Sequence, residues 1–163
     1  MNNIKNEDKA EYNVTVNEDD AIIEQALAIL EARLKREIKL TITCPDDSTK
    51  FLRLKLAERE HEVFAVMFLD NRHQLIEYTE MFNGTIDGAS VYPREVLKKA
   101  LSVNASAVIL AHNHPSGIPE PSSADERITV RLKEALGLVD IRTLDHIIVG
   151  SDSTVSLAER GIL

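Results

Sequence analysis

The residues of this chain best suited to chemistry lie in the stretch "AHNHPSGIPEPSSADE", which spans residues 111 to 126. His112 and His114 are one residue apart, so in an extended segment both imidazoles point to the same side. Neutral imidazole is a common zinc ligand, and a catalytic zinc ion typically has three protein ligands and one water. Asp125 offers a carboxylate as the third ligand. The residue types and their spacing therefore predict a zinc site.

The segment between the second histidine and the aspartate is rich in residues that shape a bend: Pro115, Gly117, Pro119 and Pro121. Proline restricts the backbone and glycine allows a sharp turn, so such a segment can hold a reproducible conformation. We expect a strand end to supply the two histidines and a helix start to supply the aspartate. Catalytic sites of α/β proteins usually lie outside the carboxyl ends of strands.

A purely structural explanation of this stretch also exists. Ser122 with Asp125, or Ser123 with Glu126, has the S-x-x-D/E spacing of a capping box, whose role can be only to hold a helix N-terminus. The two histidines would then be surface residues. The two explanations are compatible, because Ser122 can cap the helix and also face a metal.

A hydrolytic zinc site also needs a general base beside the attacking water. The chain offers several glutamates upstream, namely Glu58, Glu60, Glu62, Glu77, Glu80 and Glu95. We favour Glu62 because it stands at the head of the apolar run "VFAVMFL", where burial would raise its pKa towards a useful range. The alternative is that Glu62 is a solvated residue at a strand end.

The hydrophobic periodicity predicts the elements that must position these residues. We expect helices over 19–35, 46–59, 93–103 and 124–137, strands over 38–43, 62–70, 74–82, 106–111 and 141–150, and a short strand near the C-terminus. The strands 62–70 and 74–82 should form a hairpin. This order predicts an α/β protein with a mixed sheet flanked by helices. Residues 1–17 form an expected flexible arm, 18–44 a helix and a short strand, and 45–163 the site-bearing part of a single globular domain.

Composition limits the partners that we expect. Twenty-seven acidic and 19 basic residues give a net charge of −8, which disfavours a nucleic-acid surface. No apolar run approaches the roughly 20 residues that span a bilayer, and no signal-peptide pattern is present. With its single cysteine, Cys44, the chain is expected in the cytoplasm, without a membrane partner. The apolar face of the helix over 19–35 can pack on the domain or on a partner, a second copy of the chain included.

The sequence resembles the JAMM signature of the JAB/MPN metallohydrolases in its H-x-H-P and S-x-x-D motifs. The wider stretches "PREVLKKALSVNASAVILAHNHPSG" and "LDHIIVG" look like the RadC-like branch of that family, over roughly residues 45 to 163. The resemblance implies a three-layer, cytidine deaminase-like fold and a zinc ion bound by His112, His114 and Asp125. It also implies a metallopeptidase or isopeptidase activity on a peptide or protein substrate, with Glu62 as general base and Ser122 assisting the oxyanion.

Three other classes of protein fit the sequence less well. A non-catalytic interaction module of the same fold would lose the metal ligands, which this chain keeps. A DNA repair-associated or mobile-element protein is disfavoured by the charge, and residues 1–40 contain no helix-hairpin-helix pattern, although Asn113 matches the RadC-like branch. A zinc deaminase would need a P-C-x-x-C pair that one cysteine cannot supply. His146 is either a satisfied strand residue or a group that orients a ligand.

Overall fold

The computed structural model describes residues 22, 25, 29, 40–84 and 90–163. The chain divides into two units, residues 1–38 and 39–163. Within the first unit only Ile22, Gln25 and Ile29 are described, and all three are helical. The predicted arm over 1–17, the remainder of the helix predicted over 19–35 and the loop 85–89 lie outside the described residues.

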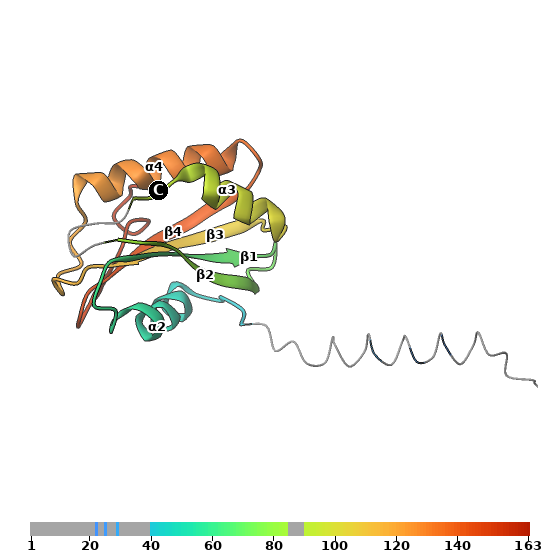
Figure 1. Cartoon of the computed structure of the whole chain (residues 1–163), viewed down its shortest axis with the longest axis horizontal. Helices are drawn as coiled ribbons and strands as arrows, with labels where there is room; N and C mark the ends of the chain where they lie inside the picture. The colour runs from blue at the N-terminus through green and yellow to red at the C-terminus, as the bar shows by residue number, and fades with distance from the viewer. Residues whose placement is uncertain (1–21, 23–24, 26–28, 30–39, 85–89) are drawn as a thin grey trace, which may run out of the picture. The chain divides into compact units, whose positions relative to one another are not determined.

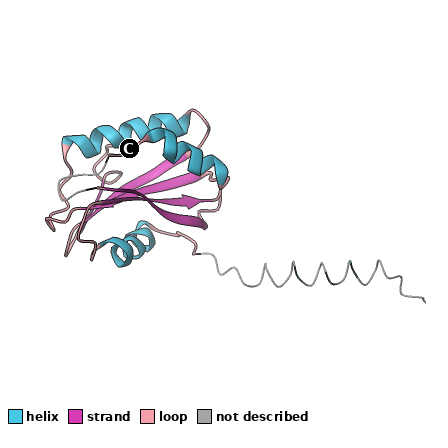
Figure 2. Ribbon diagram, viewed as in Figure 1, coloured by secondary structure: helices cyan, strands magenta, loops and turns pink. Residues whose placement is uncertain are grey.

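The described residues 40–84 and 90–163 form a mixed sheet with helices on both faces (Figures 1 and 2). In chain order the elements are α2 (Pro45–Leu56), β1 (Val63–Leu69), β2 (Leu75–Asn83), α3 (Pro93–Ser102), β3 (Ala107–Asn113), α4 (Ser123–Gly137), β4 (Arg142–Val149) and β5 (Thr154–Ser156). The strand order is β2-β1-β3-β4-β5, and β3 and β4 form the parallel pair. The predicted α/β class and mixed sheet are confirmed.

The predicted hairpin is the antiparallel pair β1 and β2. Its turn is closed by Asp70, whose Oδ1 accepts the backbone N–H groups of Arg72 at 2.8 Å and Gln74 at 2.9 Å. Every residue of β1 is buried because the strand lies between β2 and β3 and is covered on both faces. That position explains why its sequence is a continuous apolar run instead of an alternating one.

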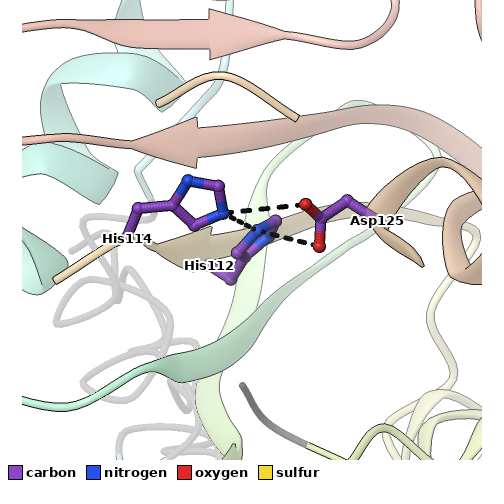
Figure 3. Close-up of side chains that lie close together, drawn as sticks. All are labelled: His112, His114 and Asp125. Carbon is purple, nitrogen blue, oxygen red and sulfur yellow. Dashed lines mark hydrogen bonds and ion pairs between the residues drawn. The ribbon is translucent and has the colours of Figure 1, made fainter. Parts of the chain in front are cut away.

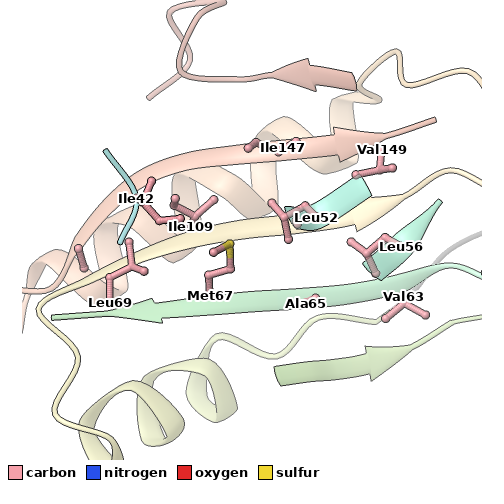
Figure 4. Close-up of a cluster of buried hydrophobic side chains, with 12 residues drawn as sticks. Ile42, Leu52, Leu56, Val63, Ala65, Met67, Leu69, Ile109, Ile147 and Val149 are labelled. Atoms are coloured by element: carbon pink, nitrogen blue, oxygen red, sulfur yellow. The ribbon is translucent and has the colours of Figure 1, made fainter. Parts of the chain in front are cut away.

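Alternate side chains of β1 enter two separate cores, which makes the fold three-layered (Figure 1). On one face Ala65 and Met67 pack with Leu52 and Leu56 of α2, as Figure 4 shows. On the other face the core combines the sheet with α3 and α4, through residues that include Phe64, Val66, Val96, Leu132 and Leu136. The predicted three-layer architecture is therefore confirmed, and α4 is fixed against β4.

The strand predicted over 38–43 is wrong in the part that the structure describes. Thr41 makes a single β-bridge with Gln74, and Ile42 is buried while its neighbours are exposed. The alternation of apolar and polar residues is real, but the pairing stops at once. The reason is that the chain turns into α2, where Oδ2 of Asp47 accepts the N–H groups of Thr43 at 2.9 Å and Cys44 at 3.2 Å.

The remaining boundaries differ slightly from the prediction. Helix α2 ends three residues before position 59, and β3 continues for two residues beyond position 111. That extension places His112 inside the strand. Among the described residues, no helix has both the length and the apolar character needed to cross a membrane.

Candidate metal centre

Strand β3 and helix α4 bring the three predicted ligands together (Figure 3). His112 lies in β3, His114 follows the strand, and Asp125 lies in the first turn of α4. Nε2 of His112 is 3.0 Å from Nε2 of His114 and 3.3 Å from Oδ1 of Asp125. Nε2 of His114 is 3.6 Å from Oδ2 of Asp125. The three groups can therefore share one ion.

The loop between the second histidine and α4 is held against the end of β4. The backbone N–H of His114 donates to the carbonyl of Val149 at 2.9 Å, and that of Ser151 donates to the carbonyl of Gly117 at 3.0 Å. Gly117 has φ +83°, a left-handed conformation that favours glycine. A Cβ atom on Gly150 would lie 2.3 Å from the carbonyl oxygen of Gly117, so this close approach requires a glycine there too.

The start of α4 orients the carboxylate of Asp125. Of the two capping boxes that the sequence allowed, the one formed by Ser122 and Asp125 is present. The hydroxyl of Ser122 donates to Oδ2 at 2.6 Å, and the backbone N–H of Ser122 donates to the same oxygen at 2.7 Å. Because Oδ2 is held in this way, Oδ1 is directed at His112.

The outer ring nitrogens of the two histidines also have partners. Nδ1 of His114 lies 2.8 Å from the carbonyl oxygen of Ile118, which can only accept, so Nδ1 carries the proton. Nδ1 of His112 lies 2.8 Å from Nε2 of His146, a fully buried residue of β4. Both rings are therefore fixed with Nε2 pointing towards the carboxylate of Asp125.

The ionisable side chains of the site shift one another's pKa values. Burial opposes ionisation of Asp125, but the adjacent imidazoles of His112 and His114 outweigh it and hold the pKa of this carboxyl well below its usual range. The hydrogen bond with Asp125 raises the pKa of His114 against the opposing effect of its partial burial. Complete burial, with His112 adding to it, lowers the pKa of His146 well below its ordinary value, so that ring is neutral.

The donor set fits a zinc ion. Ligand atoms at 2.0–2.1 Å from a tetrahedral zinc lie about 3.3 Å from one another. The separation of the two Nε2 atoms, 3.0 Å, and that of Nε2 of His112 from Oδ1 of Asp125, 3.3 Å, are close to that value, and one ligand atom from each of the three residues lies within 4.8 Å of the others. Two imidazole nitrogens and one carboxylate oxygen also form a ligand set that catalytic zinc sites use. The same atoms would suit other divalent metals that bind imidazole and carboxylate.

Glu62, the predicted general base, immediately precedes β1 and is half-buried. Phe64 pairs with His112 across the sheet, so Glu62 lies beyond that pair, at the same end of the sheet as His114. Its negative charge contributes to the raised pKa of His114. Its backbone carbonyl accepts the N–H of Gly84 at 2.8 Å.

Asn113, the residue between the two histidines, fastens the segment that carries Glu62. Its Oδ1 accepts the backbone N–H of Val63 at 2.8 Å, and its Nδ2 donates to the carbonyls of Arg59 at 3.2 Å and His61 at 3.0 Å. Two neighbouring residues of β3 thus serve different parts of the site: His112 supplies a ring to the metal cluster, and Asn113 anchors the segment that carries Glu62. Sequence reasoning noted Asn113 only as a family marker.

Sequence reasoning also missed Thr129, Gly150 and the ion pair between Glu120 and Arg160. The guanidinium of Arg160 binds both carboxylate oxygens of Glu120, at 2.7 and 2.8 Å, and joins the loop to the C-terminal turn. Thr129 could have been noticed, since it is a polar residue on the apolar face of α4, one turn after Asp125. The ion pair leaves no signal in the sequence because its partners are far apart in the chain.

Comparison with known proteins agrees with this geometry. The family model described as a RadC-like JAB domain matches residues 42–162. A UPF0758 protein of Vibrio cholerae is 63% identical over 142 residues, covering 87% of this chain and 88% of the relative. UPF0758 proteins of Nitrosococcus oceani and Marinobacter nauticus are 59% and 55% identical over 143 residues. Those two alignments cover 88% of this chain but 63% of each relative.

Proposed function

Because the chain belongs to the family of RadC-like JAB domains, we propose that it is a zinc-dependent hydrolase that cleaves an amide or isopeptide bond in a peptide or protein. The observation that carries this proposal is the cluster of His112, His114 and Asp125, whose two imidazoles have their Nδ1 atoms engaged outward and their Nε2 atoms facing the carboxylate. A non-catalytic module of this fold would have no need for that arrangement.

His112, His114 and Asp125 would hold the ion. When bound, zinc would supply a Lewis acid that polarises the substrate carbonyl and makes water a stronger nucleophile near neutral pH. Glu62 accepts the proton of the attacking water and passes it to the leaving amine. Hydroxide adds to the acyl carbon, the C–N bond then breaks, and the amine leaves with the proton. Ser122 donates its hydroxyl proton to Oδ2 of Asp125 in the resting site and would turn that proton to the oxyanion during the reaction.

The first test is metal content. We expect the natively purified protein to contain close to one zinc per chain by mass spectrometry, or to take up that amount after chelation. The variant His114→Ala should lose most of this binding. The matched control is His61→Ala, because His61 is an exposed histidine beside Glu62 that contributes no ligand. A wild-type protein that neither holds zinc nor takes it up would contradict the proposal.

The second test is activity. Zinc-loaded wild-type protein should cleave members of a peptide and isopeptide library. Glu62→Gln should keep zinc while losing at least about 100-fold in turnover, as expected for a general base. Equal turnover by Glu62→Gln and the wild type would remove Glu62 from the mechanism but leave the metal site in place.

A further inference from the structure

A buried hydroxyl on α4 connects two of the three ligands. Thr129 is fully buried, and its Oγ1 lies 2.5 Å from the backbone carbonyl oxygen of Asp125 and 2.5 Å from Nδ1 of His146. Nε2 of His146 in turn lies 2.8 Å from Nδ1 of His112. Three hydrogen bonds thus connect the backbone carbonyl of Asp125, through Thr129 and His146, to the ring of His112.

The direction of each bond in this chain follows from the chemistry of its ends. A carbonyl oxygen can only accept, so the Thr129 hydroxyl donates its one proton to Asp125. The Thr129 oxygen must then accept from His146, which places the His146 proton on Nδ1. The opposite direction would leave two oxygens in contact at 2.5 Å with no proton between them.

The surroundings of His146 keep its other nitrogen free of a proton. The ring is fully buried and packs edge to face with the ring of Phe64, with 5.5 Å between the two ring centroids. An apolar site of this kind disfavours the doubly protonated, charged imidazole. Nε2 of His146 is therefore an acceptor, so Nδ1 of His112 donates to it. With its proton on Nδ1, His112 presents a bare lone pair on Nε2.

We propose that Thr129 and His146 are positioning residues of the metal centre, which hold His112 in the one neutral tautomer that can bind a metal through Nε2. This inference rests on the proposed function, since it assumes that His112 is a ligand. It adds two residues that touch neither metal nor substrate. Because the same hydroxyl binds the carbonyl of Asp125, Thr129 also fixes the spacing between the ligand on β3 and the ligand on α4.

The substitution Thr129→Val tests this role, because it removes the hydroxyl and keeps the shape of the side chain. His146 then loses its acceptor and can move its proton to Nε2, which would push the proton of His112 onto its own Nε2. We expect the zinc dissociation constant, measured by competition with a chromogenic chelator, to rise by about 10- to 100-fold. Thr129→Ser keeps the hydroxyl and should restore affinity to near the wild-type value.

The chain supplies a matched control in Thr143 of β4. Its Oγ1 is buried without a hydrogen-bond partner among the described residues. Thr143→Val therefore deletes a buried hydroxyl without breaking a hydrogen bond, and zinc affinity should not change. Circular dichroism of each variant confirms that the comparison is made between folded proteins.

A second measurement needs no variant. In metal-free wild-type protein at alkaline pH, the ¹⁵N shifts of the imidazoles should show the Nδ1–H tautomer for both His112 and His146, and the Nε2–H form should gain population in Thr129→Val. Wild-type protein with His112 in the Nε2–H form would overturn the proposal. So would Thr129→Val with zinc affinity equal to that of the wild type. A wild-type protein that binds no zinc would overturn the proposed function itself, and the positioning role with it.

Discussion

Replacing Asn113 by leucine should destabilise the fold where residues 59–63, the segment that contains Glu62, join the sheet. Leucine has the same branching as asparagine but a larger volume, so the substitution leaves no cavity, and any crowding at this residue, which is 2% exposed, adds to the loss of stability. It deletes the three hydrogen bonds that tie β3 to the backbone of Arg59, His61 and Val63. The chain cannot repair these bonds by sheet pairing, because β1 and β3 pair only as far as Phe64 and His112.

The size of the effect follows from the burial of each partner. The bond to the N–H of Val63 is buried, and an unpaired buried donor costs about 1–3 kcal/mol. The bonds to the two carbonyls are only partly buried, so water can replace the amide and each loss costs about 0.5 kcal/mol. The free energy of unfolding should therefore fall by about 2–4 kcal/mol. For a protein of this size that corresponds to a drop in Tm of roughly 5–15 °C.

Urea and thermal unfolding of chelator-treated protein measure this change without a contribution from bound metal. Amide hydrogen exchange of Val63 should accelerate in Asn113→Leu, because its N–H loses its acceptor. The control is Asn83→Leu, since Asn83 is exposed at the end of β2 and its replacement should change stability by less than about 0.5 kcal/mol. If Asn113→Leu unfolds at the wild-type urea concentration and Val63 stays protected, the anchoring role is wrong.

Two further predictions concern the loop and the first helix of the domain. Gly150→Ala should lower the free energy of unfolding by about 2–3 kcal/mol, because its Cβ would overlap the carbonyl of Gly117. In Gly137→Ala the added Cβ meets nothing within 4 Å, so this substitution in α4 should raise the free energy of unfolding by about 0.5–1 kcal/mol. Urea unfolding of both variants checks the pair, and equal effects would contradict the close approach. Hydrogen bonds from the side chain and backbone of Thr43 lower the pKa of Asp47 to about 2. A carboxyl with a lowered pKa stabilises the fold at pH values above its ordinary pKa of 3.8, and this contribution is lost as the pH falls towards 2. In Asp47→Asn, the free energy of unfolding should therefore depend less on pH between these two values. An NMR titration that places this pKa near its ordinary value would refute the assignment.

Much of the fold could be read from local pattern. The continuous apolar run of β1, the turn at Asp70 and the amphipathic repeats of α3 and α4 are properties of short segments, so periodicity located them within a few residues. The same reasoning failed for the segment before α2. The alternation of apolar and polar residues correctly predicted that Ile42 is buried. A strand also needs a run of paired residues, however, and the segment has only the single bridge between Thr41 and Gln74. Whether a partner is available depends on the rest of the chain.

The sequence by itself determined the chemistry of the candidate site: two histidines, an aspartate with its capping serine and a glutamate before a buried strand. Those residue types and spacings are local properties of the sequence, and they were sufficient to show the resemblance to the RadC-like family. The tertiary structure decided which atoms face one another. Thr129, His146 and His112 come from three elements that are distant in sequence, and their hydrogen bonds exist only because α4 packs on β4 beside β3. Donor and acceptor directions depend on such contacts, and a one-dimensional pattern does not contain them.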